Sequence, residues 1–308
     1  PVTQGLNAQG CIDPMAQGTV TTCMICLPRA TFTMGSDRHY PEERPKRKVS
    51  VGAFHIDACA ASNKEFSAFV TDSGYKTTAE LPLDPSLMPQ AKAEDLAPGS
   101  LVFQMSKGPL PLNDFRNWWR FVPSACWHAP EGPGSSIKGR EDHPVVHVSF
   151  FDAQAYAVWA GKSLPTEKEW EYAAQGVSPG EFPWGDSLAP DGVAQANTWF
   201  GKFPYENTRH PSGPPFTVRV RSFQPNLAGL YNMIGNVWEW TCSPFQSARI
   251  SACCTPRESI REGDLLTVKG GSHLCAPSYC RRYRSSARSP QESRTSTSHI
   301  GFRCVIRT

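Results

Sequence analysis

The sequence predicts a single α+β domain in which short helices and strands are joined by long, irregular loops. Local helix-start motifs occur at three separated places, whereas residues 77–147 and 177–230 are rich in Pro and Gly and contain few apolar runs. The 308 residues include 24 Gly, 28 Pro and nine Trp, which is typical of a loop-rich fold held together by large aromatic side chains. We find no domain linker, internal repeat or low-complexity tract.

Each predicted helix begins with a capping box, in which a hydroxyl and an acid three residues later satisfy free backbone donors. Ser62 begins the first helix, Ser149 the second and Thr166 the third. A glycine is expected to stop each of them, since glycine readily adopts the left-handed conformation at a helix end. These glycines are Gly74, Gly161 and Gly176.

The bulk composition excludes several classes of protein. Hydrophobic residues make up 39% of the chain and charged residues 19%, as in ordinary globular proteins. The net charge of +3 is too small to indicate a nucleic-acid partner. No run of about 18 apolar residues occurs, so no membrane span is expected. Residues 1–10 do not resemble a signal peptide, but the chain begins with Pro, which leaves secretion open.

Cys275 and Cys280 form the most distinctive local pattern, because neighbouring Gly and Pro residues keep their segment from being helical. Three interpretations remain open: a local disulfide, half of a zinc site that needs two more ligands, or a two-thiolate site for Cu(I), which soft thiolates select. Spacing alone favours the disulfide. The total of eleven cysteines is odd, so at least one thiol has no partner within the chain.

Other ligand-like groups have simpler explanations. Cys23 and Cys26 have the spacing of redox and zinc sites, but no second such pair follows, and we interpret them as incidental thiols near a first strand. His143 and His147 flank a Val-rich run that predicts a strand, where positions four apart are poorly placed to bind one metal. Cys253 and Cys254 are adjacent, which leaves open a disulfide from either one to another loop.

Two further groups have competing interpretations. The oxygens of Asn232, Asn236 and Glu239, with a turn at Gly235, would suit a hard cation such as Ca²⁺ or form a buried polar cluster. Residues 276–308 contain seven Arg and a single acid. With no second basic region, we favour Arg packed against aromatic rings and internal carboxylates over nucleic-acid binding.

Seven sequence blocks follow one another in an order that resembles a known family, the formylglycine-generating enzymes or sulfatase-modifying factors. The resemblance extends from about residue 30 to the C-terminus and implies the C-type-lectin-like fold of that family. It divides the chain into an N-terminal extension, residues 1–29, and one domain, residues 30–308. The blocks are Met34–Ser36, His143–Ser149, Trp159–Glu167, Phe182–Gly185, Gly229–Trp240, Gly270–Ser272 and Gly301–Cys304.

The resemblance also implies an activity. In active members, two cysteines with the spacing of Cys275 and Cys280 bind one Cu(I) ion, and Ser272 matches an active-site serine beside them. The reaction uses O₂ to convert a cysteine of an unfolded sulfatase, within a Cys-x-Pro-x-Arg context, to Cα-formylglycine. Inactive paralogues lack both cysteines. The expected protein is therefore a monomeric, copper-dependent oxidase with an unfolded sulfatase or a similar polypeptide as its partner.

The resemblance further implies structural calcium. One family site is matched by Asn232 and Glu239, with backbone carbonyls from Gly235 and Val237. A second site would begin at Asn197 and Thr198, but its aspartate has no counterpart in residues 207–213, so this site is the weaker of the two.

The chain departs from the family pattern in its disulfides and in its groove. Ala157, Ala174 and Ser285 stand where secretory members have cysteines, and Cys304 keeps one half of such a pair. This indicates a bacterial-type, cytoplasmic protein. His299 replaces an Asn and Arg294 replaces an Asp, and both changes are expected to alter the substrate groove. The residues expected to line that groove are Trp238, Tyr279, Arg284 and His299.

Two other functions share this fold. An inactive member would use the groove only to hold a peptide or a protein. An iron-dependent sulfoxide synthase would need a helical partner domain with a His-x-x-x-His-x-Glu motif. The pair His143 and His147 has that His spacing, but Val148 and Ser149 follow it and no acid does. The sequence therefore favours the oxidase, with the binding protein as its alternative.

Overall fold

Four small β-sheets and three α-helices make up the regular structure within residues 22–83, 85, 90, 96–176, 180–209, 216–246 and 260–308, which the computed structural model describes. The helices are α1 (Asn63–Ser73), α2 (Phe150–Trp159) and α3 (Glu167–Gln175). The strands are β1 (Met24–Leu27), β2 (Ala30–Met34), β3 (Arg47–Val51), β4 (Phe54–Asp57), β5 (Gly99–Phe103), β6 (Trp119–Pro123), β7 (Trp238–Pro244), β8 (Leu265–Lys269), β9 (Arg288–Glu292), β10 (Ile300–Gly301) and β11 (Val305–Arg307).

All three helices begin at the predicted capping boxes. Ser62, Ser149 and Thr166 each accept a hydrogen bond from the third helical N–H, and the acid at that position bonds back to the cap. Helix α1 ends at Gly74 in the left-handed conformation. The predictions of these three helices are confirmed, because each start depends on contacts within four residues.

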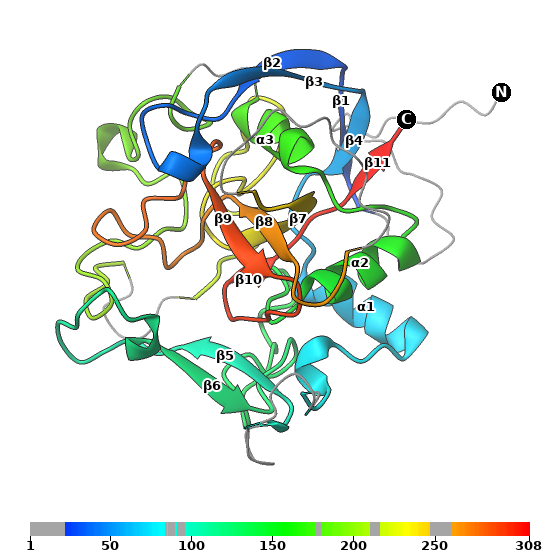
Figure 1. Cartoon of the computed structure of the whole chain (residues 1–308), viewed down its shortest axis with the longest axis vertical. Helices are drawn as coiled ribbons and strands as arrows, with labels where there is room; N and C mark the ends of the chain where they lie inside the picture. Colours follow the sequence, from blue (N-terminus) through cyan, green and yellow to red (C-terminus); the bar gives the residue numbers. More distant parts are fainter. Residues whose placement is uncertain are drawn as a thin grey trace.

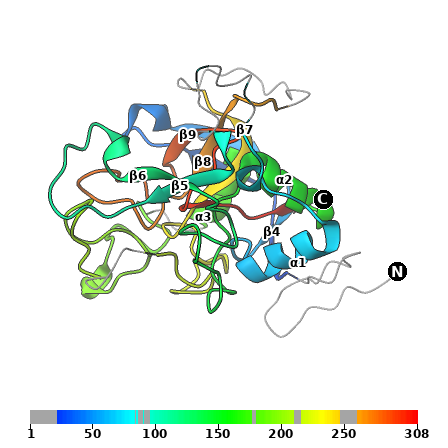
Figure 2. The same ribbon diagram turned by 90° about the horizontal axis from the view of Figure 1, so that it is seen from below.

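A four-stranded sheet with the order β10-β7-β8-β9 lies at the centre of the molecule, where α2 and α3 flank it (Figure 1). A second sheet, β1-β4-β11, pairs strands near the two ends of the chain. Two separate hairpins, β2-β3 and β5-β6, lie at opposite ends of the view. Figure 2 shows the β5-β6 hairpin from below, with the long loops extending away from the helices.

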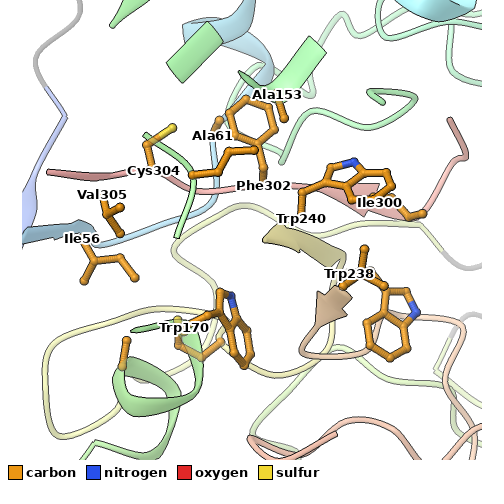
Figure 3. Packing of buried hydrophobic residues seen from close by; sticks show 14 of the residues in the cluster. Ile56, Ala61, Ala153, Trp170, Trp238, Trp240, Ile300, Phe302, Cys304 and Val305 are labelled. Carbon is orange, nitrogen blue, oxygen red and sulfur yellow. The ribbon is translucent and has the colours of Figure 1, made fainter. Parts of the chain in front are cut away.

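Large aromatic residues dominate the main core, as the count of nine Trp suggested. Trp170, Trp240 and Phe302 are fully buried and come from α3, β7 and the segment between β10 and β11. Figure 3 shows them with Ile56 and Val305 from the second sheet. The core therefore joins the two sheets and explains how a loop-rich chain folds as one domain. These observations confirm the predicted α+β class.

The predicted strand over Val145–Val148 is wrong. His147 has a φ of 59°, which is outside the extended region, and its ring is buried against Pro130 and Ser100. Conversely, residues 77–147 hold the β5-β6 hairpin, which the sequence did not predict. Both differences arise from contacts with distant segments, which outweigh local periodicity.

Several further observations concern the N-terminal segment, the cysteines and the helices. Within the predicted N-terminal extension, β1 pairs with β4 along the second sheet, while residues 1–21 lie outside the described part. The interpretation of Cys23 as an incidental thiol is wrong, because Cys23 is disulfide-bonded, whereas Cys26 and Cys304 are free thiols. The prediction for Cys253 and Cys254 concerns residues outside the described ones. None of the described helices has the length and apolar character needed to cross a membrane.

The buried His147 imidazole predicts a loss of stability in acid. Burial lowers its pKa from 6.5 to about 4, so the unfolded chain takes up a proton below pH 6.5 before the folded protein does. We expect the free energy of unfolding to fall by up to about 3 kcal/mol from this group as the pH drops from 6.5 to 4. Urea denaturation at several pH values measures it. His147→Gln should show a smaller acid-dependent loss, and equal losses in both proteins would contradict the prediction.

Candidate active site

Two free thiols face each other in the segment that follows β8. The sulfurs of Cys275 and Cys280 are 3.3 Å apart, beyond the length of a disulfide, and both cysteines are free. Cys275 is fully buried and Cys280 is partly buried. The local disulfide, which spacing alone favoured, is therefore not the state of this structure.

The backbone around Ser272 positions the deeper thiol. The Ser272 N–H donates to Cys275 Sγ over 3.4 Å, and the Ser272 hydroxyl accepts from the Leu274 N–H over 3.2 Å. The Ser272 carbonyl accepts from the Cys275 N–H. Ser272 thus closes a tight turn and aims one donor at the sulfur, which stabilises negative charge there.

The two thiols differ in acidity. Full burial raises the pKa of Cys275 well above the ordinary value for a thiol. A hydrogen bond from Cys275 and the nearby positive charge of Arg282 lower the pKa of Cys280 to about 7, against the opposing effect of its own burial. At neutral pH the pair therefore keeps one proton, held on Cys275, and exposes partial thiolate character at Cys280.

Both sulfurs lie in the wall of a pocket of about 220 Å³. The rest of the wall is mostly aromatic. Tyr279 stacks on Phe203 with ring centroids 4.5 Å apart and meets Trp118 edge-on at 5.0 Å. Three of the four residues predicted to line the groove, Trp238, Tyr279 and His299, are among the lining residues. The others are Trp118, Trp119, Phe203, Val268, Ser272, Leu274, Arg282, Ser289 and Gln291, together with the two cysteines.

His299 contributes a neutral imidazole to this wall. Burial, with the nearby His273 and His147, lowers its pKa well below 6.5. Its Nδ1 is 2.5 Å from Thr297 Oγ1, and its ring is 4.7 Å from that of Trp119. The prediction that His299 lies beside the groove is consistent with this position, where an uncharged imidazole forms part of the pocket wall.

The model of the "Sulfatase-modifying factor enzyme 1-like domain" matches residues 9–308 of this chain. The chain belongs to this family. It is 50% identical to a formylglycine-generating enzyme of Mycobacterium tuberculosis over 92% of this chain and 97% of that protein. It is 45% identical to a formylglycine-generating enzyme of Thermomonospora curvata over 92% of each. These identities confirm the predicted family.

Two further similar proteins show how much can be concluded from membership of the family. A bovine protein named "Inactive C-alpha-formylglycine-generating enzyme 2" is 36% identical over 92% of this chain and 88% of its own length. The solved structure of PvdO from Pseudomonas aeruginosa superposes with a TM-score of 0.64 at 22% identity, covering 96% of this chain and 98% of that one. The second likeness shows the fold alone. The family thus includes proteins named as inactive, so membership alone does not establish activity. The cysteine site is the feature from which activity has to be inferred.

The predicted calcium residues of this family member divide into two groups. Asn232 has a buried Oδ1 without a hydrogen-bond partner, while its amide nitrogen donates to the carbonyls of Arg219 and Val220. Such an oxygen fits a hard cation. Glu239 does not fit as well, because both of its oxygens accept hydrogen bonds from Arg303 and its charge is already balanced.

Of the remaining predicted calcium residues, Asn197 and Gly235 approach each other closely, whereas Thr198 keeps an unpaired oxygen that would also fit a hard cation. The carbonyl of Asn197 accepts from the Asn236 N–H, and a Cβ at Gly235 would lie 2.5 Å from that carbonyl oxygen. Thr198 has a buried hydroxyl without a partner, and Val237 is buried in a small apolar cluster. The two expected sites are therefore neighbours, and calcium binding at either one stays a prediction.

Two residues expected at the groove lie outside the wall of this pocket. Arg284 is buried and ion-paired with Glu43, so it supports the fold instead of the pocket wall. Arg294 pairs with Glu262 and lines a different pocket. Arg282, which the sequence argument missed, occupies the wall instead. Its position two residues after Cys280 was the available signal, but the direction of its side chain depends on distant contacts.

The acidity of Cys280 predicts selective alkylation of the metal-free, reduced protein. We expect the rate of iodoacetamide labelling at Cys280 to rise through a midpoint near pH 7, because the thiolate is the nucleophile. Peptide mass spectrometry resolves the labelled position. Cys275→Ala should move the midpoint upward, since it removes the donor that stabilises the thiolate. A midpoint above pH 8.5 in the unaltered protein would contradict the assignment.

Calcium binding at Asn232 predicts a change in thermal stability. If one ion is bound at about 100 times its dissociation constant, EGTA should lower the Tm by about 4 °C. Asn232→Ala should have a lower Tm and should no longer respond to EGTA, because the free oxygen is lost. An identical Tm with and without EGTA would show that calcium does not stabilise this fold.

Proposed function

We propose that this protein is a copper- and O₂-dependent oxidase that converts a cysteine of an unfolded sulfatase, within a Cys-x-Pro-x-Arg context, to Cα-formylglycine. The observation that carries the proposal is the pair of free thiols, 3.3 Å apart, in the wall of an aromatic pocket. The relatives named formylglycine-generating enzyme, at 45–50% identity over most of the chain, support it.

The donor set suits a soft, monovalent ion. Within the described part of the chain, no third His, Cys, Asp or Glu joins the pair to make a larger ligand group. Cys275 and Cys280 would thus hold Cu(I) as two thiolates, and soft sulfur ligands favour that ion over hard ones. When bound, Cu(I) would supply an open site for the substrate thiolate and for O₂.

The side chains around the pair would prepare the site for this substrate. The Ser272 N–H would stabilise negative charge on the deeper sulfur once a metal displaces its proton. The rings of Tyr279, Phe203 and Trp118 pack edge-on and face-to-face, so they form a rigid wall that limits water and orients a peptide. Binding energy from the peptide flanks would then place the substrate's β-carbon for reaction.

Catalysis is the first prediction of this proposal. With copper and air, the protein should convert a Cys-x-Pro-x-Arg peptide to an aldehyde, seen by mass spectrometry as a loss of mass. Cys275→Ala and Cys280→Ala should each abolish conversion and copper binding, since one thiolate does not hold the ion. Ser272→Ala should slow turnover less, about 2- to 13-fold, because it removes a hydroxyl hydrogen bond worth about 0.5–1.5 kcal/mol and leaves the Ser272 N–H in place.

The same assay separates the oxidase from a binding protein. A member that only holds a peptide would bind it equally well in all three variants and would make no aldehyde in any. A folded, copper-loaded protein that leaves several such peptides unchanged in air would therefore rule out the oxidase. Near-native melting temperatures of the variants serve as the control for folding.

A further inference from the structure

The segment that follows Cys280 is held by a turn that is far away in the sequence. Both Nε and an Nη of Arg282 donate to the same oxygen of Glu42, over 3.1 and 2.6 Å. The Arg282 guanidinium also lies 3.8 Å from the centroid of the Tyr40 ring. The Tyr40 hydroxyl accepts from the Arg281 N–H over 3.2 Å. Arg282 is therefore fixed on two sides, by a carboxylate and by an aromatic face.

This turn is itself anchored in the core. Glu43, next to Glu42, is fully buried and forms an ion pair with Arg284. Its other carboxylate oxygen accepts from the Ser286 hydroxyl over 2.7 Å. The Glu43 carbonyl accepts from the Ser36 N–H. Because buried, fully bonded charges hold one geometry, the turn provides a rigid support for Arg282.

The side chain of Arg282, held in place by this turn, lies beside the thiol site. It lines the same pocket as the cysteines, and its positive charge favours the thiolate form of Cys280. Two thiolates around one monovalent cation carry a net charge of about −1, and a third thiolate from a substrate would make it about −2. A largely buried site stabilises such a charge only with a nearby positive partner, and Arg282 is the cation in the pocket wall.

We propose that Arg282 is the positioning residue that balances the charge of the thiol site, and that Glu42 sets how much positive charge Arg282 delivers there. The inference rests on the proposed function, since it assumes that the cysteine pair binds Cu(I) and then a substrate thiolate. It assigns the turn at Tyr40–Glu43, distant in sequence from the cysteines, a direct influence on metal and substrate affinity.

The geometry allows the effect of the Glu42 charge to be separated from the effect of its hydrogen bonds to Arg282. Both Arg282 hydrogen bonds end on one oxygen, Oε1 of Glu42, and Glu42→Gln keeps an oxygen that accepts both. This variant removes the negative charge but preserves the contacts. Arg282→Met removes the positive charge from the pocket wall. A purely structural role predicts little change in the first variant, whereas charge balance predicts opposite changes in the two.

Cu(I) affinity is the primary measurement, made without oxygen or substrate against a competing chelator. We expect Arg282→Met to bind Cu(I) about tenfold more weakly, because the negatively charged site loses its neighbouring positive charge. Glu42→Gln should bind it more tightly than the unaltered protein. Arg282→Lys should recover part of the loss, since the charge returns without the forked geometry.

Arg281→Met is the matched control. Arg281 is the neighbouring residue and forms a more exposed ion pair with Glu181, so the same net charge is lost from a side chain that does not line the pocket. Its Cu(I) affinity should stay within about twofold of the unaltered protein. In the peptide assay, Arg282→Met should also raise KM by about tenfold, because the third thiolate increases the negative charge.

The outcomes distinguish this inference from the proposed function. If Arg282→Met matches Arg281→Met in Cu(I) affinity, or if Glu42→Gln weakens binding as Arg282→Met does, charge balance by Arg282 is wrong while oxidase activity is untouched. If the unaltered protein binds Cu(I) but makes no aldehyde, the oxidase is wrong, and the affinity series still tests Arg282. Failure of the unaltered protein to bind Cu(I) overturns both.

Discussion

A single buried ion pair connects the parts of this molecule that are far apart in sequence. Arg303 donates to both oxygens of Glu239, over 2.8 Å each, and the indole of Trp170 donates to the same carboxylate over 2.7 Å. The guanidinium also reaches the carbonyls of Asp57 and Tyr231. One charge thus joins β4, α3, β7 and the C-terminal segment. Loss of either partner of such a pair is expected to cost about 3–5 kcal/mol, because the other is left buried and unpaired.

The cysteine site depends on this framework through β7 and β8. Where β8 ends, Gly270 has a φ of 94° and Gly271 a φ of 73°. A Cβ on Gly271 would lie 2.7 Å from the Arg282 carbonyl, so only glycine lets the outgoing chain return this closely. The close approach brings the segment after Cys280 against the segment before Ser272, and the two thiols then face each other across it.

The two thiols of the site differ in acidity because their surroundings differ. One thiol is fully buried and retains its proton, while the other borders a pocket beside a guanidinium and gives its proton up more easily. Sulfur ligands with this asymmetry, in a wall of stacked rings, suit a soft metal and a thiol substrate better than hydrolysis or phosphate binding. The same reasoning explains why Glu239 suits a calcium ion less well than its sequence context indicated, since Arg303 already neutralises it.

The sequence by itself determined the features whose causes are local. The capping boxes at Ser62, Ser149 and Thr166 specify helix starts within four residues, and the spacing of Cys275 and Cys280 keeps two soft ligands on one short loop. The family blocks then identified the fold. Only the tertiary structure decided the direction of each arginine: Arg284 turns inward to Glu43, while Arg282 lies on Tyr40 and faces the pocket. It likewise turned His147 out of an extended conformation. The direction of a long side chain is set by the groups that it binds. The partners of Arg282 and Arg284 lie some 240 residues away in the sequence. Local sequence patterns carry no information over such a separation.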